Sequence, residues 1–119
     1  MNFNDFLKVE YIKDENGKLL TRIKIEDYCY NIHKIVHGGV IMTLIDSACG
    51  KAASDKVKKD IVTLDGSTNF LRACKDTKYL YGHCKVKKAG RKIISVDCDV
   101  VDDLGNLIAI GRFNFYVIK

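Results

Sequence analysis

A chain of 119 residues, 47% of them hydrophobic, has room for one domain with a modest core and excludes a second, so we expect 1–119 to form a single domain. The net charge of +5 comes from lysines spread along the chain, which predicts solvated surfaces or a phosphorylated ligand rather than a nucleic acid partner. No stretch approaches the roughly 18 apolar residues of a membrane span, and residues 1–8 hold no run of signal-peptide length, so we expect a cytoplasmic protein that does not enter a membrane.

The five cysteines are widely spaced, at Cys29, Cys49, Cys74, Cys84 and Cys98. Their number is odd and no Cys-x-x-Cys pair occurs, so the sequence supports neither a disulfide framework nor a zinc site. We therefore expect no bound metal and interpret the cysteines as small residues of the core.

The chain is predicted to begin with a short helical or irregular lead at 3–7, followed by a β-hairpin. Its strands are expected at 9–12 and 19–25, because the Asn16-Gly17 pair between them is the strongest short hairpin signal. No hydrophobic period is sustained from 26 to 36, which indicates an irregular loop leading to a helix.

A glycine pair, Gly38-Gly39, opens an apolar segment that predicts the one long helix. Small residues there leave backbone N–H groups uncovered at the first turn, where the peptide dipoles favour negative charge. A rotation of about 100° per residue places an apolar face on the helix, and Asp46 about 150° from the centre of that face, toward solvent or a partner. The residues of the face are Val40, Ile41, Leu44, Ile45, Ala48, Cys49 and Ala52. The polar stretch 54–59 is interpreted as a connection.

Four more strands are expected, at 61–70, 79–87, 94–100 and 107–118, and short turns between the later ones predict antiparallel neighbours. Alternation in the first of them places Thr63 and Asp65 on one side and continues through Gly66, which we expect to let another backbone or the helix pack closely. The last strand is apolar on both faces, so we expect burial on both sides or pairing at an interface. The fold class predicted is α+β, with one helix wrapped by a curved antiparallel sheet of about six strands.

A set of motifs in this order resembles the hotdog-fold thioesterases of the phenylacetate-degradation (PaaI-like) type. The motifs are Asn31-x5-His37-Gly38-Gly39-x4-Leu44-x-Asp46, Val62-Thr63-Leu64-Asp65, Asn69-Phe70-Leu71-Arg72-Ala73, Lys88-x-Gly90-Arg91 and Ala109-x-Gly111-Arg112. The resemblance covers nearly the whole chain. It implies hydrolysis of an acyl- or aryl-CoA thioester by a homodimer or a homotetramer, with active sites between subunits. Coenzyme A would enter as part of the substrate, and no separate cofactor is implied.

The resemblance also implies roles for particular residues. Asp46 would activate water as general base or attack the thioester carbon as nucleophile, and the sequence leaves both open. The Gly38 N–H would hold the oxyanion. Asn31 would orient water or the thioester, and Thr63 would assist Asp46 from the same subunit, facing the partner's Asn31 and Gly38. His37 would orient the loop or take part in catalysis.

Candidate contacts for the CoA moiety are Gly39, Arg72, Lys88 and Arg91. The three cations could meet phosphates, although exposed cations are ordinary on protein surfaces. The chain departs from the family pattern at three positions, one of which is Ala73, where the family often has proline. Lys34 replaces a frequent glycine three residues after the loop asparagine, and Gly50 replaces a hydroxyl found in some relatives one turn after the acid.

Two other functions remain open at this point. A hotdog hydratase or dehydratase acting on acyl thioesters would use His37 and Asp46 as paired acid and base. A non-catalytic acyl-CoA-binding protein is the other alternative, although a pure binder gains little from a carboxylate near an anionic ligand. A helix-borne acid after His-Gly-Gly resembles the hydrolases better.

Overall fold

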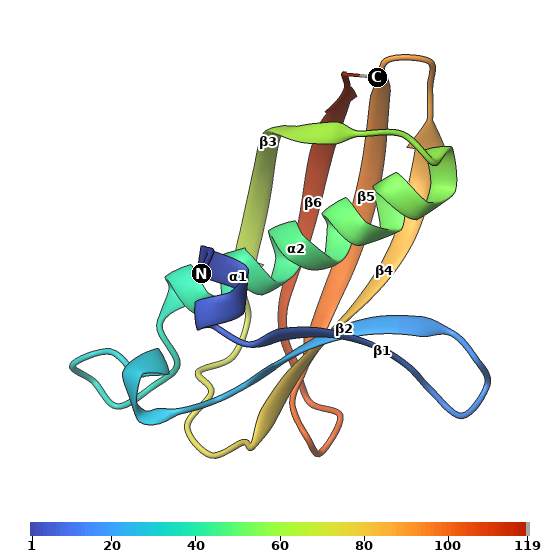
Figure 1. Ribbon diagram of the computed structural model, residues 1–119. Coiled ribbons are helices and arrows are strands. Elements are labelled where there is room, and N and C mark those ends of the chain that lie inside the picture. Colours follow the sequence, from blue (N-terminus) through green and yellow to red (C-terminus); the bar gives the residue numbers. More distant parts are fainter. Residues whose placement is uncertain (119) are drawn as a thin grey trace.

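The computed structural model describes residues 1–118 and shows one long helix, α2 (Gly38–Val57), lying across one face of a six-stranded antiparallel sheet (Figure 1). A short helix, α1 (Phe3–Phe6), and a 3-10 turn, η1 (Asp27–Cys29), complete the helical part of these residues. None of these helices has the length and apolar character needed to cross a membrane. In order of adjacency, the strands are β1 (Val9–Lys13), β2 (Leu19–Lys24), β4 (Tyr79–Ala89), β5 (Ile93–Val101), β6 (Leu107–Val117) and β3 (Ile61–Phe70).

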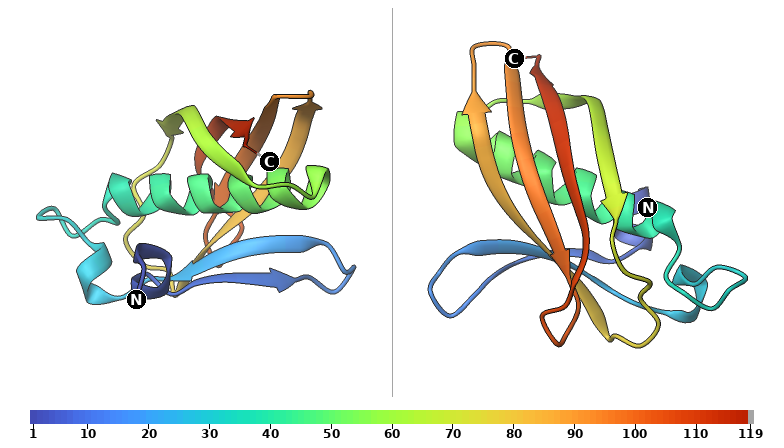
Figure 2. Two further views of the ribbon diagram at one scale, coloured as in Figure 1. Left: turned by 45° about the horizontal axis from the view of Figure 1, so that its top comes forward. Right: turned by 180° about the vertical axis from the view of Figure 1, so that it is seen from behind.

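The sheet bends around the helix, so that β1 and β2 pass on one side of α2 while β3 to β6 cover another (Figure 2). The predicted α+β architecture, with a curved antiparallel sheet around one long helix, is confirmed. Strands β1 and β3 are the two edges of the sheet, and each leaves one row of backbone groups without a neighbouring strand within residues 1–118.

The N-terminal hairpin forms where the sequence predicts it, within one residue at each strand end. Asp14 closes the turn, because its N–H donates to the Lys18 carbonyl at 2.8 Å and its Oδ1 accepts the N–H groups of Asn16 and Lys18. Gly17 has a φ of 78°, in the left-handed region that favours glycine. The Asn-Gly signal therefore corresponds to a real tight turn.

The prediction that 54–59 is a connection is wrong, because α2 continues through most of it to Val57. Ala53 is buried and Val57 is half-buried against the core, so the polar residues between them occupy the outer surface of the last turn. The helix ends at Lys58, which has a φ of 55° and donates its N–H to the Ser54 carbonyl at 2.7 Å.

Replacement of Lys58 by glycine is expected to raise the free energy of unfolding by about 1 kcal/mol. An L-residue in the left-handed region is strained by about 1–2 kcal/mol, and the freedom that glycine gains in the unfolded chain offsets part of the relief. Urea unfolding at fixed protein concentration measures the difference. Lys56→Gly, in the last turn of the helix, is the control and should lower stability. A loss of stability in Lys58→Gly would contradict this account.

The apolar face of α2 forms the centre of the core. Its buried residues are Ile41, Leu44, Ile45, Ala48, Cys49 and Ala53. The predicted face is correct at its centre, whereas Val40 and Ala52 at its margins are half-buried. The buried residues of α2 form one hydrophobic cluster with residues of the sheet, which include Leu80, Val96 and Phe115. The side of the helix that carries Asp46 is left outside this cluster.

The prediction that the last strand is buried on both faces is wrong for the chain by itself. Phe113 and Phe115 of β6 are buried on the helix side, whereas Arg112 and Tyr116 alternate with them and are exposed. Arg112 Nε lies 2.6 Å from Asp97 Oδ1 on β5, and this contact holds the pKa of the Asp97 carboxyl below its usual value. A charged pair therefore occupies the outer face, and pairing of β6 at an interface stays a prediction.

Candidate functional site

His37 joins the loop to the start of α2 and caps the helix. Its Nδ1 accepts the N–H of Gly39 at 2.8 Å, and its own N–H donates to the Cys29 carbonyl at 2.8 Å. The Gly38 N–H has no acceptor among residues 1–118. One backbone donor at the positive end of the helix dipole is therefore left for an anionic or polarised oxygen.

A cavity of about 360 Å³ opens beside this donor. Its lining residues are Asn31, Ile35, Val36, Gly38, Ile41, Phe70, Leu71, Arg72, Ala73 and Cys74. A Cβ added at Gly38 would lie 3.1 Å from Cζ of Phe70, so the glycine permits the ring to sit close to the first turn of the helix. The cavity thus combines apolar walls with a backbone donor, an amide and a cation.

Asn31 organises the loop that borders the cavity. Its Oδ1 accepts the N–H groups of His33 at 2.9 Å and Ile35 at 3.4 Å, which leaves the Nδ2 group for a ligand or water. Lys34 stands where the family often has glycine and adopts a φ of 60°, the left-handed conformation that glycine favours. The loop therefore accommodates the departure from the family pattern through a left-handed lysine.

Asp46 and Thr63 meet on the other side of α2. Thr63 Oγ1 donates to Asp46 Oδ1 at 2.7 Å, and both residues belong to the same chain. A β-bulge between Thr63 and Asp65 shifts the register, so Thr63 opposes Phe115 on the helix side of the sheet while Asp65 opposes Asn114. The prediction that Thr63 and Asp65 share a side is therefore wrong, because the bulge turns Thr63 toward the helix.

Tyr11 of β1 is a neighbour of Asp46 that the sequence pattern does not predict. Burial raises the pKa of the Tyr11 phenol, Asn4 and Lys51 act in the opposite direction, and the nearby Asp46 carboxylate raises the pKa again. Lys51 Nζ lies 5.6 Å from the centre of the Tyr11 ring. No local sequence pattern relates a tyrosine in a hairpin strand to a helix residue more than 30 positions away. Their proximity is therefore visible only in the folded chain.

Within one chain the predicted site residues fall into two groups. Asn31, Gly38 and Arg72 line the cavity at the start of α2, with His37 and Gly39 beside it. Asp46 is eight residues farther along the helix, so it lies about 12 Å away along the axis. The structure therefore pairs Asp46 with Thr63 but does not bring it to the Gly38 N–H.

Lys88 and Arg91 lie at the end of the sheet that holds Thr63. Thr63 opposes Phe115, Phe115 opposes Ile94, and Ile94 opposes Ala89, which is the residue after Lys88. Both cations are exposed, and neither lines the cavity at Gly38. Arg72 alone among the three candidate cations lies at that cavity, where its Nη1 donates to Asn106 Oδ1 at 3.3 Å.

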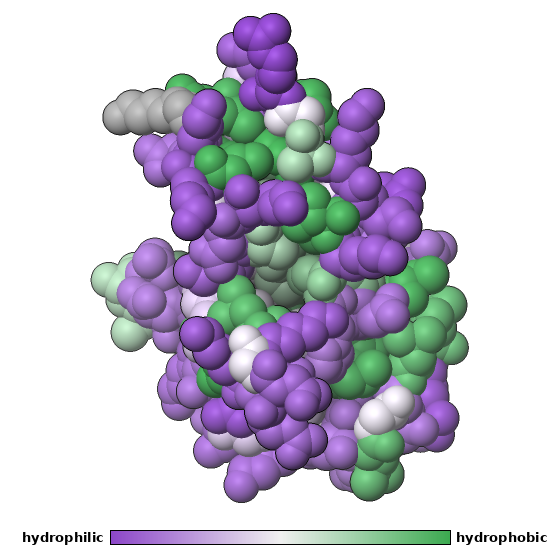
Figure 3. Space-filling view, turned by 90° about the vertical axis from the view of Figure 1, so that its right-hand side faces the viewer, coloured by the Kyte–Doolittle hydropathy of each residue, from purple (hydrophilic) through white to green (hydrophobic). Residues whose placement is uncertain are grey.

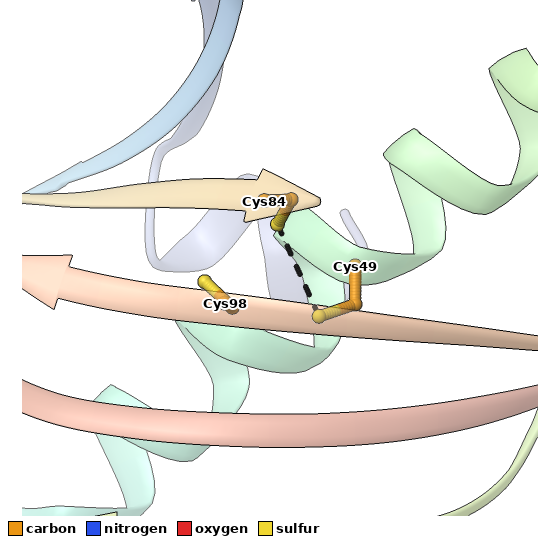
Figure 4. Close-up of side chains that lie close together, drawn as sticks. All are labelled: Cys49, Cys84 and Cys98. Carbon is orange, nitrogen blue, oxygen red and sulfur yellow. Dashed lines mark hydrogen bonds between the residues drawn. The ribbon is translucent and has the colours of Figure 1, made fainter. Parts of the chain in front are cut away.

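Three of the five cysteines form a cluster that their spacing in the sequence does not predict. Cys49 on α2, Cys84 on β4 and Cys98 on β5 point toward one another, with all three Sγ atoms within 4.8 Å (Figure 4). Cys84 and Cys98 oppose each other in the sheet, and Cys84 Sγ lies 3.9 Å from Cys49 Sγ. The expectation of small core residues is confirmed for packing, but the grouping is a property of the fold.

Hydrogen bonding within the cluster shifts the pKa values of Cys84 and Cys49 in opposite directions. The thiols of Cys49 and Cys98 lower the pKa of Cys84 to about 4, against the effect of burial. The pKa of Cys49 is raised, first by its hydrogen bonds to Cys84 and Cys98 and then by burial. By contrast, Cys74 outside the cluster has its pKa raised to about 11 chiefly by burial.

Two proteins of Saccharolobus solfataricus, each named "Putative esterase", are similar to this chain in sequence. The first is 31% identical over 107 residues, which cover 88% of this chain and 70% of that protein. The second is 29% identical over 115 residues, which cover 96% of this chain and 81% of that protein.

Solved structures share the fold over nearly the full chain. A Bacillus halodurans protein solved with CoA has a TM-score of 0.92 at 24% identity, covering 100% of this chain and 80% of that one. The E. coli PaaI protein from the phenylacetic acid degradation operon has a TM-score of 0.87 at 21% identity, covering 98% and 83%. The sequence model of the thioesterase superfamily matches residues 33–109, more than half of the chain. The chain therefore belongs to the thioesterase superfamily and has its hotdog fold.

Proposed function

We propose that this thioesterase-superfamily member hydrolyses an acyl- or aryl-CoA thioester to a free acid and CoA. The observation that carries the proposal is the hydrogen bond from Thr63 Oγ1 to Asp46 Oδ1 at 2.7 Å, made outside the apolar core. A hydroxyl donor on one oxygen fixes the carboxylate and leaves the other oxygen free to take a proton or to attack carbon. The Gly38 N–H supplies the matching donor for a carbonyl oxygen.

The site is completed by a second copy of the chain, because Asp46 and Gly38 of one chain are about 12 Å apart along α2. Strand β3 offers the surface for that copy. It is an edge of the sheet, and its large apolar side chains Val62, Leu64 and Phe70 are exposed in the single chain. Pairing of two such edges would form a homodimer, alone or within a dimer of dimers, and bring Asp46 toward the partner's Asn31 and Gly38.

The reaction at this shared site has two possible first steps. As general base, Asp46 takes a proton from water while the water oxygen bonds to the thioester carbon. As nucleophile, Asp46 bonds to that carbon itself, the C–S bond breaks to leave an anhydride, and water then opens the anhydride. In both routes the carbonyl oxygen gains negative charge facing the Gly38 N–H. Collapse of this charge breaks the C–S bond in either route, and the CoA sulfur leaves and takes up a proton.

Contacts with the CoA moiety are proposed for Arg72 and Gly39 at the cavity, and for Lys88 and Arg91 at the opposite end of the sheet. The Bacillus halodurans structure with CoA supports a CoA ester as the substrate class. Arginine suits phosphate because its planar group donates two parallel hydrogen bonds. Arg72 is the strongest candidate of the three cations because it lies at the same cavity as Gly38.

The hydratase alternative fits the structure less well. His37 Nδ1 already accepts the Gly39 N–H, and the ring lies at the start of the helix that carries Asp46 more than two turns later. Only Nε2 of this ring therefore remains for proton transfer, even where a second copy of the chain brings its Asp46 nearby. A pure binding role also fits less well. The hydrogen bond from Thr63 holds a carboxylate at Asp46, and a carboxylate repels an anionic ligand.

The test of the proposed function is release of free thiol from a panel of acyl- and aryl-CoA esters. The panel includes aromatic, medium-chain and hydroxylated acyl groups. The shape of an acyl pocket between two subunits would set the preference among these groups, and a single chain does not show that shape. Turnover of at least one ester supports the proposal and ranks the substrates. Binding of CoA without turnover of any ester would overturn it.

A mixture of two inactive variants is expected to recover activity if the site is shared. Asp46→Asn removes the acid, and Asn31→Asp keeps the Oδ1 acceptor that holds the loop but loses the Nδ2 donor. In a mixed dimer one site holds both changes and the other holds neither, so random exchange of subunits should restore about a quarter of wild-type turnover.

Sedimentation of the same samples provides the control. We expect a dimer or tetramer for the wild type and for both variants. A stable monomer with full activity, or a mixture no more active than its two components, would contradict the shared site.

A further inference from the structure

We propose that Cys49, Cys84 and Cys98 form a binding site for one divalent thiophilic cation of the Zn²⁺ class. The cluster lies in the core between α2 and the sheet, whereas the proposed catalytic acid Asp46 faces away from that core. The proposal therefore concerns a second site and does not depend on the proposed hydrolysis.

The sulfur positions already match the geometry that such an ion requires. A Zn–S bond of about 2.3 Å in a tetrahedral arrangement places neighbouring sulfurs about 3.8 Å apart. The Cys49 and Cys84 sulfurs are 3.9 Å apart, and all three Sγ atoms lie within 4.8 Å of one another. Cys98 needs to move by no more than about 1 Å to complete a three-sulfur set.

Rigid elements hold the three cysteines, so the site is preformed. Cys84 and Cys98 are direct partners in the ladder between β4 and β5, and Cys49 projects from the helix packed on those strands. Gly82 keeps room for the cluster, since a Cβ there would lie 3.3 Å from Cys98 Sγ and 3.1 Å from Ala48 Cβ. Ligands placed on packed helices and strands lose little freedom when they bind an ion.

A cavity gives an ion access to the cluster and space for a fourth ligand. It measures about 250 Å³ and is lined by Lys18, Leu19, Leu20, Thr21, Ala48, Ala52, Asp55, Gly82 and Cys84. Figure 3 shows a hollow with a largely apolar floor between hydrophilic side chains on the corresponding side of the molecule. Cys84 is half-buried and reaches this cavity, whereas Cys49 and Cys98 are fully buried behind it. Water can therefore occupy the fourth position of a tetrahedral ion.

The net charge of the buried complex favours a divalent over a monovalent ion. A divalent cation bound to three thiolates leaves a complex of net charge −1. A monovalent soft ion such as Cu⁺ would leave −2, which is more costly in a core where two of the ligands are fully buried. Mg²⁺ and Ca²⁺ prefer oxygen ligands, and the described residues offer only sulfur within the cluster.

The experiment titrates the reduced, metal-free full chain with Zn²⁺ and, separately, with Cd²⁺, whose thiolate complexes absorb in the ultraviolet. We expect one ion per chain, thiolate absorption with Cd²⁺, release of protons and a higher melting temperature. Cys84→Ala and Cys98→Ala should lose the stoichiometric ion. Cys29→Ala and Cys74→Ala are matched controls, because they remove buried cysteines outside the cluster and should keep it. Asp46→Asn should also keep it.

A second measurement does not rely on variants that could fail to fold. X-ray absorption of the Zn²⁺-loaded wild type should show three sulfurs at about 2.3 Å and one light atom. A shell of nitrogen and oxygen only would overturn the proposal, as would equal binding by Cys84→Ala and wild type. Absence of stoichiometric binding by the reduced wild type would also overturn it. A disulfide among the three cysteines, found by mass spectrometry after preparation with reductant, would assign the cluster to redox chemistry instead.

Discussion

Asp46→Asn is expected to reduce turnover of the best CoA ester by at least about a hundredfold, the usual lower bound for loss of a general acid or base. Asparagine has nearly the same shape and can still accept the Thr63 hydroxyl hydrogen bond at its Oδ1. It can neither take a proton from water nor attack the thioester carbon. Turnover should therefore fall while the fold and CoA binding stay largely intact. Free thiol release at saturating ester measures the effect, and CoA binding is measured separately.

Asp55→Asn is the matched control, because it makes the same chemical change on the same helix. Asp55 Oδ1 pairs with Lys51 Nζ at 3.3 Å on the exposed surface, and an exposed pair at this spacing contributes little. Its turnover should equal that of the wild type. Wild-type turnover in Asp46→Asn would show that the carboxylate takes no part in the reaction. Equal losses in both variants would indicate a general effect of charge on the helix.

Gly66→Ala is expected to lower the free energy of unfolding by about 2 kcal/mol, within the range found when a packed site is overfilled. A Cβ at Gly66 would come within 2.5 Å of two carbons of the Phe113 ring, which lies over the glycine from the neighbouring strand β6. The ring is buried and has to shift for the methyl group to fit. Urea unfolding at fixed protein concentration measures the loss.

Gly50→Ala provides the opposite control. Gly50 is in α2, and its nearest neighbour for an added Cβ is a ring carbon of Phe115 at 3.5 Å, an ordinary contact. Alanine there should raise the free energy of unfolding by up to about 1 kcal/mol, since glycine is a poor helix former. If Gly66→Ala is as stable as the wild type, the close approach of the Phe113 ring does not constrain this position.

The sequence predicts the close approach at Gly66 but not the group that makes it. The sequence indicates that a glycine within a continuing strand allows something to pack against it, and we expected a backbone or the helix. The partner is the aromatic ring of Phe113, because residue 66 opposes residue 113 on the helix side of the sheet. Register between strands depends on long-range pairing, which a local pattern does not contain.

The sequence by itself determined the elements that local chemistry controls. The Asn16-Gly17 turn and the centre of the apolar face of α2 depend on neighbours within a few residues, and both agree with the structure. The sequence also contains the motif from His37 to Asp46. The catalytic roles of its residues stay predictions. Polar residues in the last turn of α2 obscured the helix end, because the solvent side of a helix and a loop have similar composition.

Only the tertiary structure decided which side chains meet. A single bulge turned Thr63 toward Asp46 and overruled the alternation that placed it beside Asp65. Three cysteines spread over 50 positions came within 4.8 Å, because one helix packs across two neighbouring strands. Such distances follow from how distant segments pack together, and spacing along the chain carries no record of them.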